Sequence, residues 1–217
     1  MTAGQSTSWA VVLATGNVGK AAEFRRLLGG RFSLISLPEI AAMSNIEPPD
    51  IEESGESYYE NALKKALGYF AYAKAALPET GVPHPVLADD SGIELDALGG
   101  VPGVYSARFG GEDLSWPARW QHLQDELQTT GTGPWPARFR CVLCYYDGVK
   151  PPIFFEGITE GSVIPAAKGT AGFGYDPIFY SDALGTTFGQ ASDEKKDTIS
   201  HRARALEAFV RGLEFGK

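Results

Sequence analysis

An apolar run, a polar loop and an amphipathic segment follow one another at residues 9–30, and this succession favours an α/β fold. Residues 9–14 (WAVVLA) are typical of a short buried strand. Beyond the loop, apolar side chains recur at helical spacing (Ala21, Phe24, Leu27, Leu28). Gly29 then gives a usual helix end. A strand that feeds a helix through a short loop is typical of α/β domains.

The middle of the chain continues this alternation. A helix is predicted from Ser57, which forms a capping-box pattern with Glu60, and Pro78 is expected to end it. Residues 85–98 predict a strand that ends in two aspartates, a turn at Ser91–Gly92 and a second extended segment.

The last half of the chain is predicted to hold one glycine-rich loop, two strands and two helices. The loop at residues 99–111 contains five glycines and is expected to be mobile or wrapped around something. The remaining elements are a helix at 115–127, strands at 136–146 and 150–164 joined by an Asp147–Gly148 turn, and a helix from about Ser200. No repeat or linker interrupts this pattern, so we predict one domain over residues 1–217, with residues 1–8 flexible.

The composition excludes several classes of function. The 217 residues are 43% hydrophobic and carry a formal net charge of -8, which repels nucleic acids and anionic membrane surfaces. The first nine residues show no signal-peptide pattern, and no apolar run approaches the ~18 residues of a membrane-spanning helix. We therefore expect a cytoplasmic protein that binds neither nucleic acid nor membranes.

The two cysteines, Cys141 and Cys144, form a C-x-x-C pattern inside a predicted strand. A separation of three places them on opposite strand faces, and no second pair completes a zinc site. Packed, reduced thiols are the better interpretation.

The loop at residues 14–24 (ATGNVGKAAEF) looks like a phosphate-binding P-loop with two parts missing. Ala14 replaces the first glycine of G-x-x-x-x-G-K-[ST], and Ala21 replaces the hydroxyl that would hold magnesium. The loop still leads into a helix N-terminus, where backbone N–H groups attract anions, and Lys20 adds a full charge. The alternative is a plain strand-to-helix turn with an exposed lysine.

Adjacent carboxylates stand at Asp89 and Asp90, after an apolar strand. Such a pair is tolerated when a cation or a proton is shared. Alternation along a strand sends one side chain inward and the other outward, so we expect one of them to be the working group. A divalent ion held there would be Mg²⁺, because its ligands would be hard oxygens. The alternative is a polar DDSG turn.

More polar groups lie in residues 51–66. Glu60 is expected to serve as a capping partner, whereas Glu53 lies in the preceding loop and is freer to reach a metal. Asn61 and Lys65 are four residues apart on one helix face, for which a solvated polar stripe is the simpler interpretation in isolation.

Two stretches near the C-terminus could hold a base. In residues 169–179 (GTAGFGYDPIF), glycines allow close approach of a ligand, and Phe173 and Tyr175 offer flat surfaces. His201 and Arg202 stand in the first turn of a helix whose predicted cap is Ser200. Cations there oppose the helix dipole, so a bound anion or base carbonyl would explain them better than stability does.

Five stretches together resemble the Ham1-like, inosine triphosphatase-like family of non-canonical purine nucleoside triphosphate pyrophosphatases. In chain order they are ATGNVGK, ESGESYYENALKKA, LADDSGIELDALGGVPGVYSARF, GTAGFGYDPIF and KKDTISHR. The resemblance implies Mg²⁺-dependent hydrolysis of ITP, dITP and XTP to the monophosphate and pyrophosphate, by a homodimer. It also implies an elongated mixed β-sheet flanked by helices, with two lobes around a central active-site cleft.

Site residues are transferred from the family by position. The phosphate-binding loop corresponds to Thr15, Gly16, Asn17, Val18, Gly19 and Lys20. The resemblance implies that Asp90 is the general base and a metal ligand, that Ser91 contacts the substrate and that Lys65 adds charge near the phosphates. It implies Glu53 as the second metal ligand, although Glu52 takes that place in an ungapped alternative.

The same transfer assigns the residues that bind the purine base. The purine base would be held by Phe173, Gly174, Tyr175 and Asp176, and Lys196, His201 and Arg202 would close over it. The segment at residues 181–190 and the residues before Trp9 match the family least.

A mechanism follows from these assignments. Asp90 would activate water for attack on the α-phosphorus, and Mg²⁺, Lys20 and Lys65 would neutralise the departing pyrophosphate. Donors such as Arg202 and His201 would favour bases with a carbonyl at C6 over adenine. Two other functions remain as alternatives: a P-loop kinase or NTPase, which would release phosphate, and a non-catalytic nucleotide-binding regulatory module.

Overall fold

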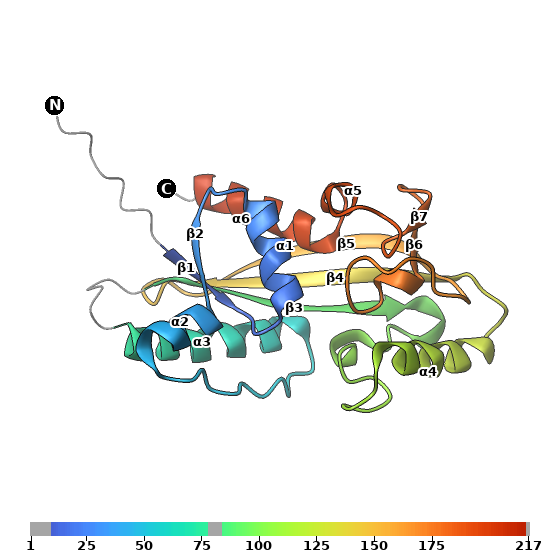
Figure 1. Ribbon diagram of the computed structural model, residues 1–217, viewed down its shortest axis with the longest axis horizontal. Helices are drawn as coiled ribbons and strands as arrows, with labels where there is room; N and C mark the ends of the chain where they lie inside the picture. Colours follow the sequence, from blue (N-terminus) through green and yellow to red (C-terminus); the bar gives the residue numbers. More distant parts are fainter. Residues whose placement is uncertain (1–9, 78–83, 216–217) are drawn as a thin grey trace. The chain divides into compact units, whose positions relative to one another are not determined.

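The computed structural model describes residues 10–77 and 84–215 (Figure 1). Within them, seven strands form one sheet in the order β2-β1-β3-β4-β5-β6-β7. The strands are β1 (Ala10–Ala14), β2 (Ser33–Ser36), β3 (Val86–Leu95), β4 (Trp135–Tyr146), β5 (Ile153–Val163), β6 (Phe179–Ser181) and β7 (Thr186–Thr187). β1 pairs in parallel with β2 and β3, whereas β6 pairs antiparallel with β5 and β7. The mixed α/β fold predicted from the sequence is confirmed; its elongation and its cleft stay predictions.

The first four helices lie between these strands along the chain, and α5 and α6 follow β7. They are α1 (Val18–Leu28), α2 (Leu37–Ser44), α3 (Tyr58–Ala76), α4 (Trp116–Gln128), α5 (Asp193–Asp197) and α6 (His201–Phe215), with short 3₁₀ turns η2 (Asp96–Leu98), η3 (Gly103–Tyr105) and η4 (Asp176–Ile178). None of the helices in the described part is long and apolar enough to cross a membrane.

The chain clusters into two compact units, each built from separate segments. Unit 1 comprises Met1–Ser54, Tyr59–Asp89 and Leu143–Phe154, and unit 2 comprises Gly55–Tyr58, Asp90–Val142 and Phe155–Lys217. The prediction of one domain over the whole chain stays a prediction. Residues 1–8, which were expected to be flexible, lie outside the described residues.

Unit 1 is a layered α/β arrangement around β1. Parallel pairing aligns Ala14 with Ala88, which brings the loop after β1 next to Asp89 of β3. In Figure 1, α1 lies on one face of these strands, and α2 and α3 lie on the other. α1 ends as predicted, because Gly29 has a φ of 55° and donates its N–H to Arg25 O.

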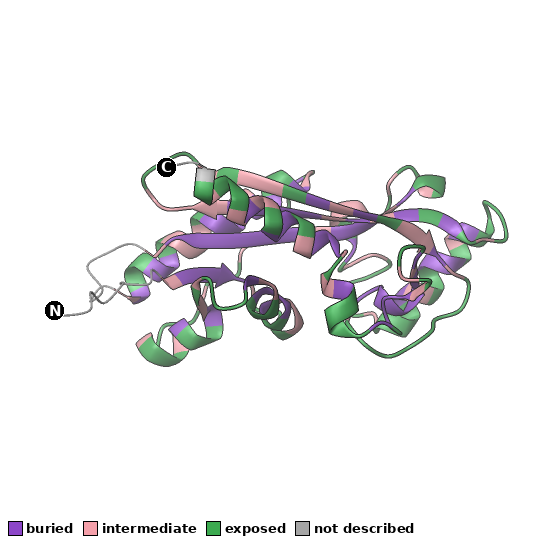
Figure 2. Ribbon diagram, turned by 90° about the horizontal axis from the view of Figure 1, so that it is seen from above, coloured by how far each residue is buried: buried purple, intermediate pink, exposed green. Residues whose placement is uncertain are grey.

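Unit 2 has an apolar core between its strands and α4. The core contains Leu123 and Leu127 of α4 together with Phe139, Phe179 and Phe188. On the other face α6 packs so closely on β5 that a Cβ at Gly157 would lie 2.1 Å from His201 O. Figure 2 shows buried, intermediate and exposed residues along the strands. β3 is buried along most of its length, as expected for a strand covered on both faces, whereas β5 is mostly intermediate or exposed.

The turn predicted at Ser91–Gly92 is wrong. β3 is one continuous strand from Val86 to Leu95. Glycine is required at position 92 because a Cβ there would lie 2.3 Å from Gly103 O, and Ser106 Oγ accepts the N–H of Ile93 at 2.9 Å. The residues that suggested a turn therefore allow a close approach between the strand and the loop that follows it.

The glycine-rich loop at residues 99–111 folds back on β3. It contains η3, and Pro102 forms a bridge with Glu94. The loop thus contacts the strand that precedes it, and the expectation that it is mobile or wrapped around something stays a prediction.

Other predicted boundaries agree with the structure. The hairpin between β4 and β5 turns where Asp147 Oδ1 accepts the N–H groups of Val149 and Lys150, both at 2.8 Å. α6 begins at His201, and Ser200 Oγ caps it by accepting the N–H of Ala203 at 3.1 Å. α3 ends at Ala76, and the stop predicted at Pro78 lies outside the described residues.

Both cysteines are free and buried, as predicted. The strand that carries them is covered on both faces, so opposite orientations still lead into packed interior. Burial raises the pKa of the Cys144 thiol to about 12, which leaves it protonated at neutral pH. A redox or metal-binding role for this C-x-x-C is therefore disfavoured.

Candidate functional site

The predicted phosphate loop lies in unit 1 at the junction of β1 and α1. Asn17 caps α1, because its Oδ1 accepts the N–H of Lys20 at 3.0 Å and its own N–H donates to Thr15 Oγ1 at 3.1 Å. The local contacts thus fix the loop, while Val18 remains 80% exposed. An open loop with an ordered helix N-terminus suits an anionic group.

The charge of Lys20 is directed at Asp89, the aspartate that the sequence-based assignment left without a role. Lys20 Nζ contacts Asp89 Oδ1, and the Asp89 side chain is almost fully buried. The parallel pairing of β1 with β3 brings the two segments together. The structure therefore places a cation beside the first carboxylate of the pair, within unit 1.

A second lysine–carboxylate contact joins Lys65 and Glu53, also in unit 1. Lys65 Nζ lies 3.3 Å from Glu53 Oε1, and the Lys65 side chain is largely buried. This contact distinguishes Glu53 from Glu52, which is exposed. The interpretation of Asn61 and Lys65 as a solvated stripe is wrong, because both are buried.

Asp90 and Ser91 belong to unit 2. Both aspartates of the pair are 4% exposed, so the expectation of one inward and one outward side chain is wrong; β3 is buried along most of its length. Arg202 Nη2 donates to Ser91 Oγ at 2.9 Å. Arg202, which is predicted to contact the purine base, thus contacts Ser91, the residue after the predicted general base Asp90.

The predicted base-binding segment is fixed from within unit 2. Asp176 Oδ2 accepts the N–H of Phe173 at 2.8 Å and also pairs with Lys196 Nζ at 2.7 Å. Lys196 and Asp176 are both almost fully buried. Lys196 Nζ and Arg202 Cζ lie 5.1 and 5.6 Å from the centroid of the Phe173 ring. The structure therefore gathers Phe173, Asp176, Lys196 and Arg202.

Tyr175 has a different setting from Phe173. Its ring belongs to the apolar core, and its hydroxyl donates to Ser106 O at 2.8 Å. Burial raises the pKa of this hydroxyl above its ordinary value. Phe173, which is half-buried, is the aromatic of the two that keeps an open surface.

His201 also packs into unit 2. Its ring stacks on Phe139, with centroids 4.7 Å apart and planes 15° apart. Arg202, next in the chain, is 1% exposed. These first-turn side chains of α6 are thus held by packing and by the contact with Ser91, and the cationic end of the helix does not face bulk water.

The predicted site residues divide between the two units at the aspartate pair. Unit 1 holds Thr15–Lys20, Glu53, Lys65 and Asp89, and unit 2 holds Asp90, Ser91, Phe173–Asp176, Lys196, His201 and Arg202. The boundary falls at the peptide bond that joins Asp89 and Asp90.

The available donors fit a magnesium ion in chemical type. Glu53, Asp89 and Asp90 supply hard carboxylate oxygens, and two of the three are buried. Among residues 10–77 and 84–215 no group of three or more acidic, histidine or cysteine side chains is clustered for a metal. Mg²⁺ often relies on one or two carboxylates together with substrate phosphates and water, so this donor set is compatible with it.

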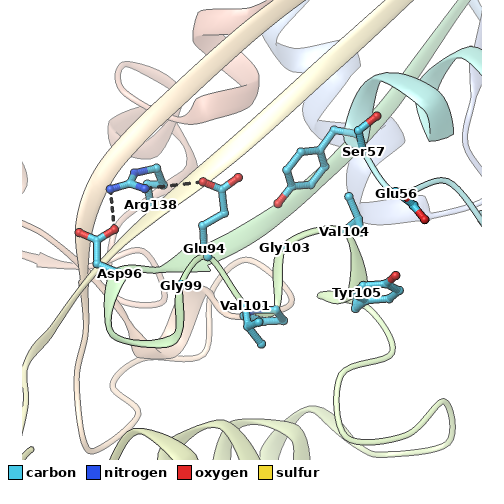
Figure 3. A pocket seen from close by; sticks show the side chains of 13 residues that line it. Glu56, Ser57, Glu94, Asp96, Gly99, Val101, Gly103, Val104, Tyr105 and Arg138 are labelled. Atoms are coloured by element: carbon cyan, nitrogen blue, oxygen red, sulfur yellow. Dashed lines mark hydrogen bonds and ion pairs between the residues drawn. The ribbon is translucent and has the colours of Figure 1, made fainter. Parts of the chain in front are cut away.

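Unit 2 also contains a cavity of about 660 Å³ that none of the predicted site residues lines. Figure 3 shows the loop residues Val101 and Tyr105 at this cavity, together with Arg138, Glu94 and Asp96. Arg138 pairs with Asp96 at 2.7 Å and lies 3.7 Å from Glu94. Two of the three acids that line the cavity are therefore partly neutralised by Arg138.

The sequence alone missed two features near these residues. One is the contact of Lys20 with Asp89, which needs knowledge of the strand pairing. The other is a pair of tryptophans on α4, of which Trp120 Nε1 donates to Gly174 O at 2.9 Å. Their i, i+4 spacing was the available signal, but by itself it indicates only one helix face.

Comparisons with known proteins show the family of the chain. The model of the Ham1 family matches residues 11–212. A dITP/XTP pyrophosphatase of Shouchella clausii (strain KSM-K16) is 41% identical over 207 residues, covering 94% of this chain and 96% of its own. A dITP/XTP pyrophosphatase of Yersinia pseudotuberculosis serotype I (strain IP32953) is 40% identical over 205 residues, covering 94% and 97%. The structure of the Staphylococcus aureus Ham1 protein is 36% identical, with a TM-score of 0.76, and covers 96% of this chain and all of its own.

Proposed function

The chain belongs to the Ham1 family, and from this premise we propose that it hydrolyses the non-canonical purine triphosphates ITP, dITP and XTP to the monophosphate and pyrophosphate. The observation that carries the proposal is about 40% identity, over nearly the full length, with proteins named dITP/XTP pyrophosphatase. The enzyme would thereby remove deaminated purines from the nucleotide pool.

The base-side geometry supports this substrate class. Lys196 and Arg202 are buried donors beside Phe173, the aromatic with an open surface. A base with a carbonyl at C6 would accept hydrogen bonds from the N–H groups of these side chains that Asp176 and Ser91 do not use, whereas the amino group of adenine would give those N–H groups no acceptor. Because stranding buried donors is costly, this arrangement favours inosine and xanthosine.

The phosphate end is proposed to use the groups of unit 1. Lys20 and Lys65 already lie beside Asp89 and Glu53, so each lysine is held in place before a phosphate arrives. The backbone N–H groups at the start of α1 add donors for phosphate oxygens. These groups would bind the triphosphate and neutralise the pyrophosphate as it leaves.

Asp90 is proposed as the general base. It takes a proton from a water molecule as the water oxygen bonds to the α-phosphorus and the bond from that phosphorus to the pyrophosphate oxygen breaks. Glu53 and Asp90 would hold Mg²⁺, which when bound supplies charge neutralisation for the phosphates. Lys20 and Lys65 orient the same phosphates, so positioning contributes beside electrostatics.

Identification of the released anion tests the proposal. Incubation with ITP and Mg²⁺ should yield IMP and pyrophosphate, and turnover should stop when the metal is chelated. Release of inorganic phosphate instead would indicate a kinase or P-loop NTPase type of activity. Nucleotide binding without turnover would indicate a non-catalytic module.

Two further expectations belong to this proposal, namely that the enzyme acts in the cytoplasm and that it forms a homodimer. The family resemblance supports the dimer, and a role on the free nucleotide pool supports the location. Light scattering on the purified protein should give twice the mass of 23.3 kDa, and a mass of one chain at micromolar concentration would contradict the dimer.

A further inference from the structure

The first two turns of α4 lie against the segment Phe173–Asp176 within unit 2. Trp120 Nε1 donates to Gly174 O at 2.9 Å. Trp116 meets the Tyr175 ring edge-on, with centroids 5.3 Å apart and planes at 74°, and its ring would lie 3.6 Å from a Cβ at Gly174. One helix face therefore contacts both central residues of the segment.

The contact with Gly174 restrains the backbone at a position with little freedom to compensate. Gly174 is buried and has a φ of 66°, a conformation that favours glycine. A buried carbonyl needs a donor, and the indole of Trp120 can only donate. The hydrogen bond thus fixes the orientation of the Gly174 peptide.

The helix that carries Trp120 is itself anchored. The buried guanidinium of Arg119, the preceding residue, donates to the carbonyls of Phe109, Gly111, Glu112 and Leu114. One turn further on, Gln124 Nε2 donates to Ile164 O at 3.1 Å. Because α4 is tied to two separate loops, it acts as a fixed support for the segment.

The other end of the segment is held independently. Asp176 Oδ2 accepts from Phe173 N and from Lys196 Nζ. The segment is therefore clamped by α4 at Gly174 and by Lys196 at Asp176, and Phe173 stands at its open end. Movement at Gly174 would shift Phe173, the adjacent residue.

We propose that Trp120 is a positioning residue for recognition of the purine base, acting through the Gly174 carbonyl, and that Trp116 supports it. The inference rests on the proposed function, which gives Phe173–Asp176 its ligand. Trp120 fixes Gly174, Gly174 fixes the Phe173 ring, and the ring together with Lys196 receives the base. Loss of the indole N–H weakens binding of the base and leaves the chemistry at the α-phosphorus unchanged.

The chain offers a matched control for the substitution Trp120→Phe. Trp135 belongs to the same apolar cluster against which Trp120 packs, and its Nε1 has no hydrogen-bond partner among the described residues. Trp135→Phe makes the same change from indole to phenyl without removing a hydrogen bond. Thermal unfolding of both variants reports the packing cost that they share.

The readouts are the dissociation constant for IMP and the kinetic constants for ITP. Trp120→Phe should raise the IMP dissociation constant and the KM for ITP by about three- to tenfold, the range expected for one lost hydrogen bond, with kcat within about twofold. Trp135→Phe should leave all three within about twofold. Equal effects of the two variants, or a fall in kcat at constant KM, would overturn the inference.

Other outcomes remain informative. If Trp120→Phe does not fold, Trp116→Leu at a position 38% exposed should raise the IMP dissociation constant about two- to fourfold, and an unchanged constant would overturn the inference. If the wild type releases pyrophosphate from ITP but the variants match their control, the inference falls and the proposed function stands. If the wild type neither binds IMP nor hydrolyses ITP, the proposed function fails and this inference fails with it.

Discussion

The two units hold their predicted site residues in opposite ways. In unit 1 the loop after β1 is open to solvent at Val18, and Lys20 at the start of α1 is partly exposed beside Asp89. In unit 2 Lys196 and Arg202 are almost fully buried. The difference matches the two ends of a nucleotide, because the triphosphate is the same for every base and needs only charge, whereas discrimination between bases needs buried donors at fixed positions.

Substitution of Asp90 should lower activity most, because Asp90 is the proposed general base. The groups that bind the phosphates or the purine base are not proposed to take the proton from water. Asp90→Asn keeps the shape of this buried side chain but removes the base, so kcat for ITP should fall by roughly 10²- to 10⁴-fold. Pyrophosphate release measures the loss. The exposed Asp182→Asn serves as the control and should keep wild-type activity; a kcat within tenfold of wild type for Asp90→Asn would remove Asp90 as the base.

Substitution of Arg202 tests the buried donors of unit 2 that are proposed to recognise the purine base. Arg202→Ala should lower the ratio of kcat/KM for ITP to that for ATP by about ten- to a hundredfold, because it removes a buried side chain that we propose as a donor to the purine base. The ratio is measured on one preparation, so the fraction of folded enzyme cancels. Arg211→Ala on the exposed face of α6 is the matched control, and an unchanged ratio in Arg202→Ala would contradict its role in selectivity.

The phosphate-binding loop of unit 1 should give a smaller and less selective effect. Lys20→Met should raise the KM for ITP and for ATP alike, by about three- to tenfold, because both nucleotides carry the same triphosphate. Added salt should raise the KM of the wild type more steeply than that of the variant. Lys74→Met, an exposed lysine of the same unit, is the control, and a change confined to ITP would reverse the comparison between the units.

Local structure was largely predictable because its causes are close in sequence. Gly29 ends α1 and Ser200 caps α6 through contacts within four residues, and the Asp147 turn closes through its own side chain. The sequence also held an unused signal for α2, since Ser36 and Glu39 form a capping box just before an apolar stretch.

The rest depended on contacts between distant segments. Gly92 looked like a turn residue, yet it serves the approach of Gly103, eleven residues away. The pairing of Lys20 with Asp89 follows from strand order, which no local pattern encodes. The family resemblance supplied the candidate residues for the site, but their division between two units and the support of Gly174 by Trp120 required the structure.

The smallest predicted effect concerns local contacts in unit 1, at the capping box of α2. The Ser36 N–H donates to Glu39 Oε2 at 2.7 Å, and this bond, with Arg25 at 2.6 Å, lowers the pKa of the Glu39 carboxyl. A lowered folded-state pKa means that the charged form stabilises the fold above the unfolded-state pKa, and that this stability is lost as pH falls through the folded-state value.

Glu39→Gln should therefore cost more stability at pH 7 than at pH 3. Because the side chain is half exposed, solvent screening limits the difference in unfolding free energy to about 0.5 kcal/mol. Urea unfolding of the wild type and the variant at both pH values measures it, with the exposed Glu112→Gln as control. A difference that grows on acidification would show that the capping box does not act through the charge of Glu39, and that unit 1 owes the position of α2 to packing on β1 and β2 alone.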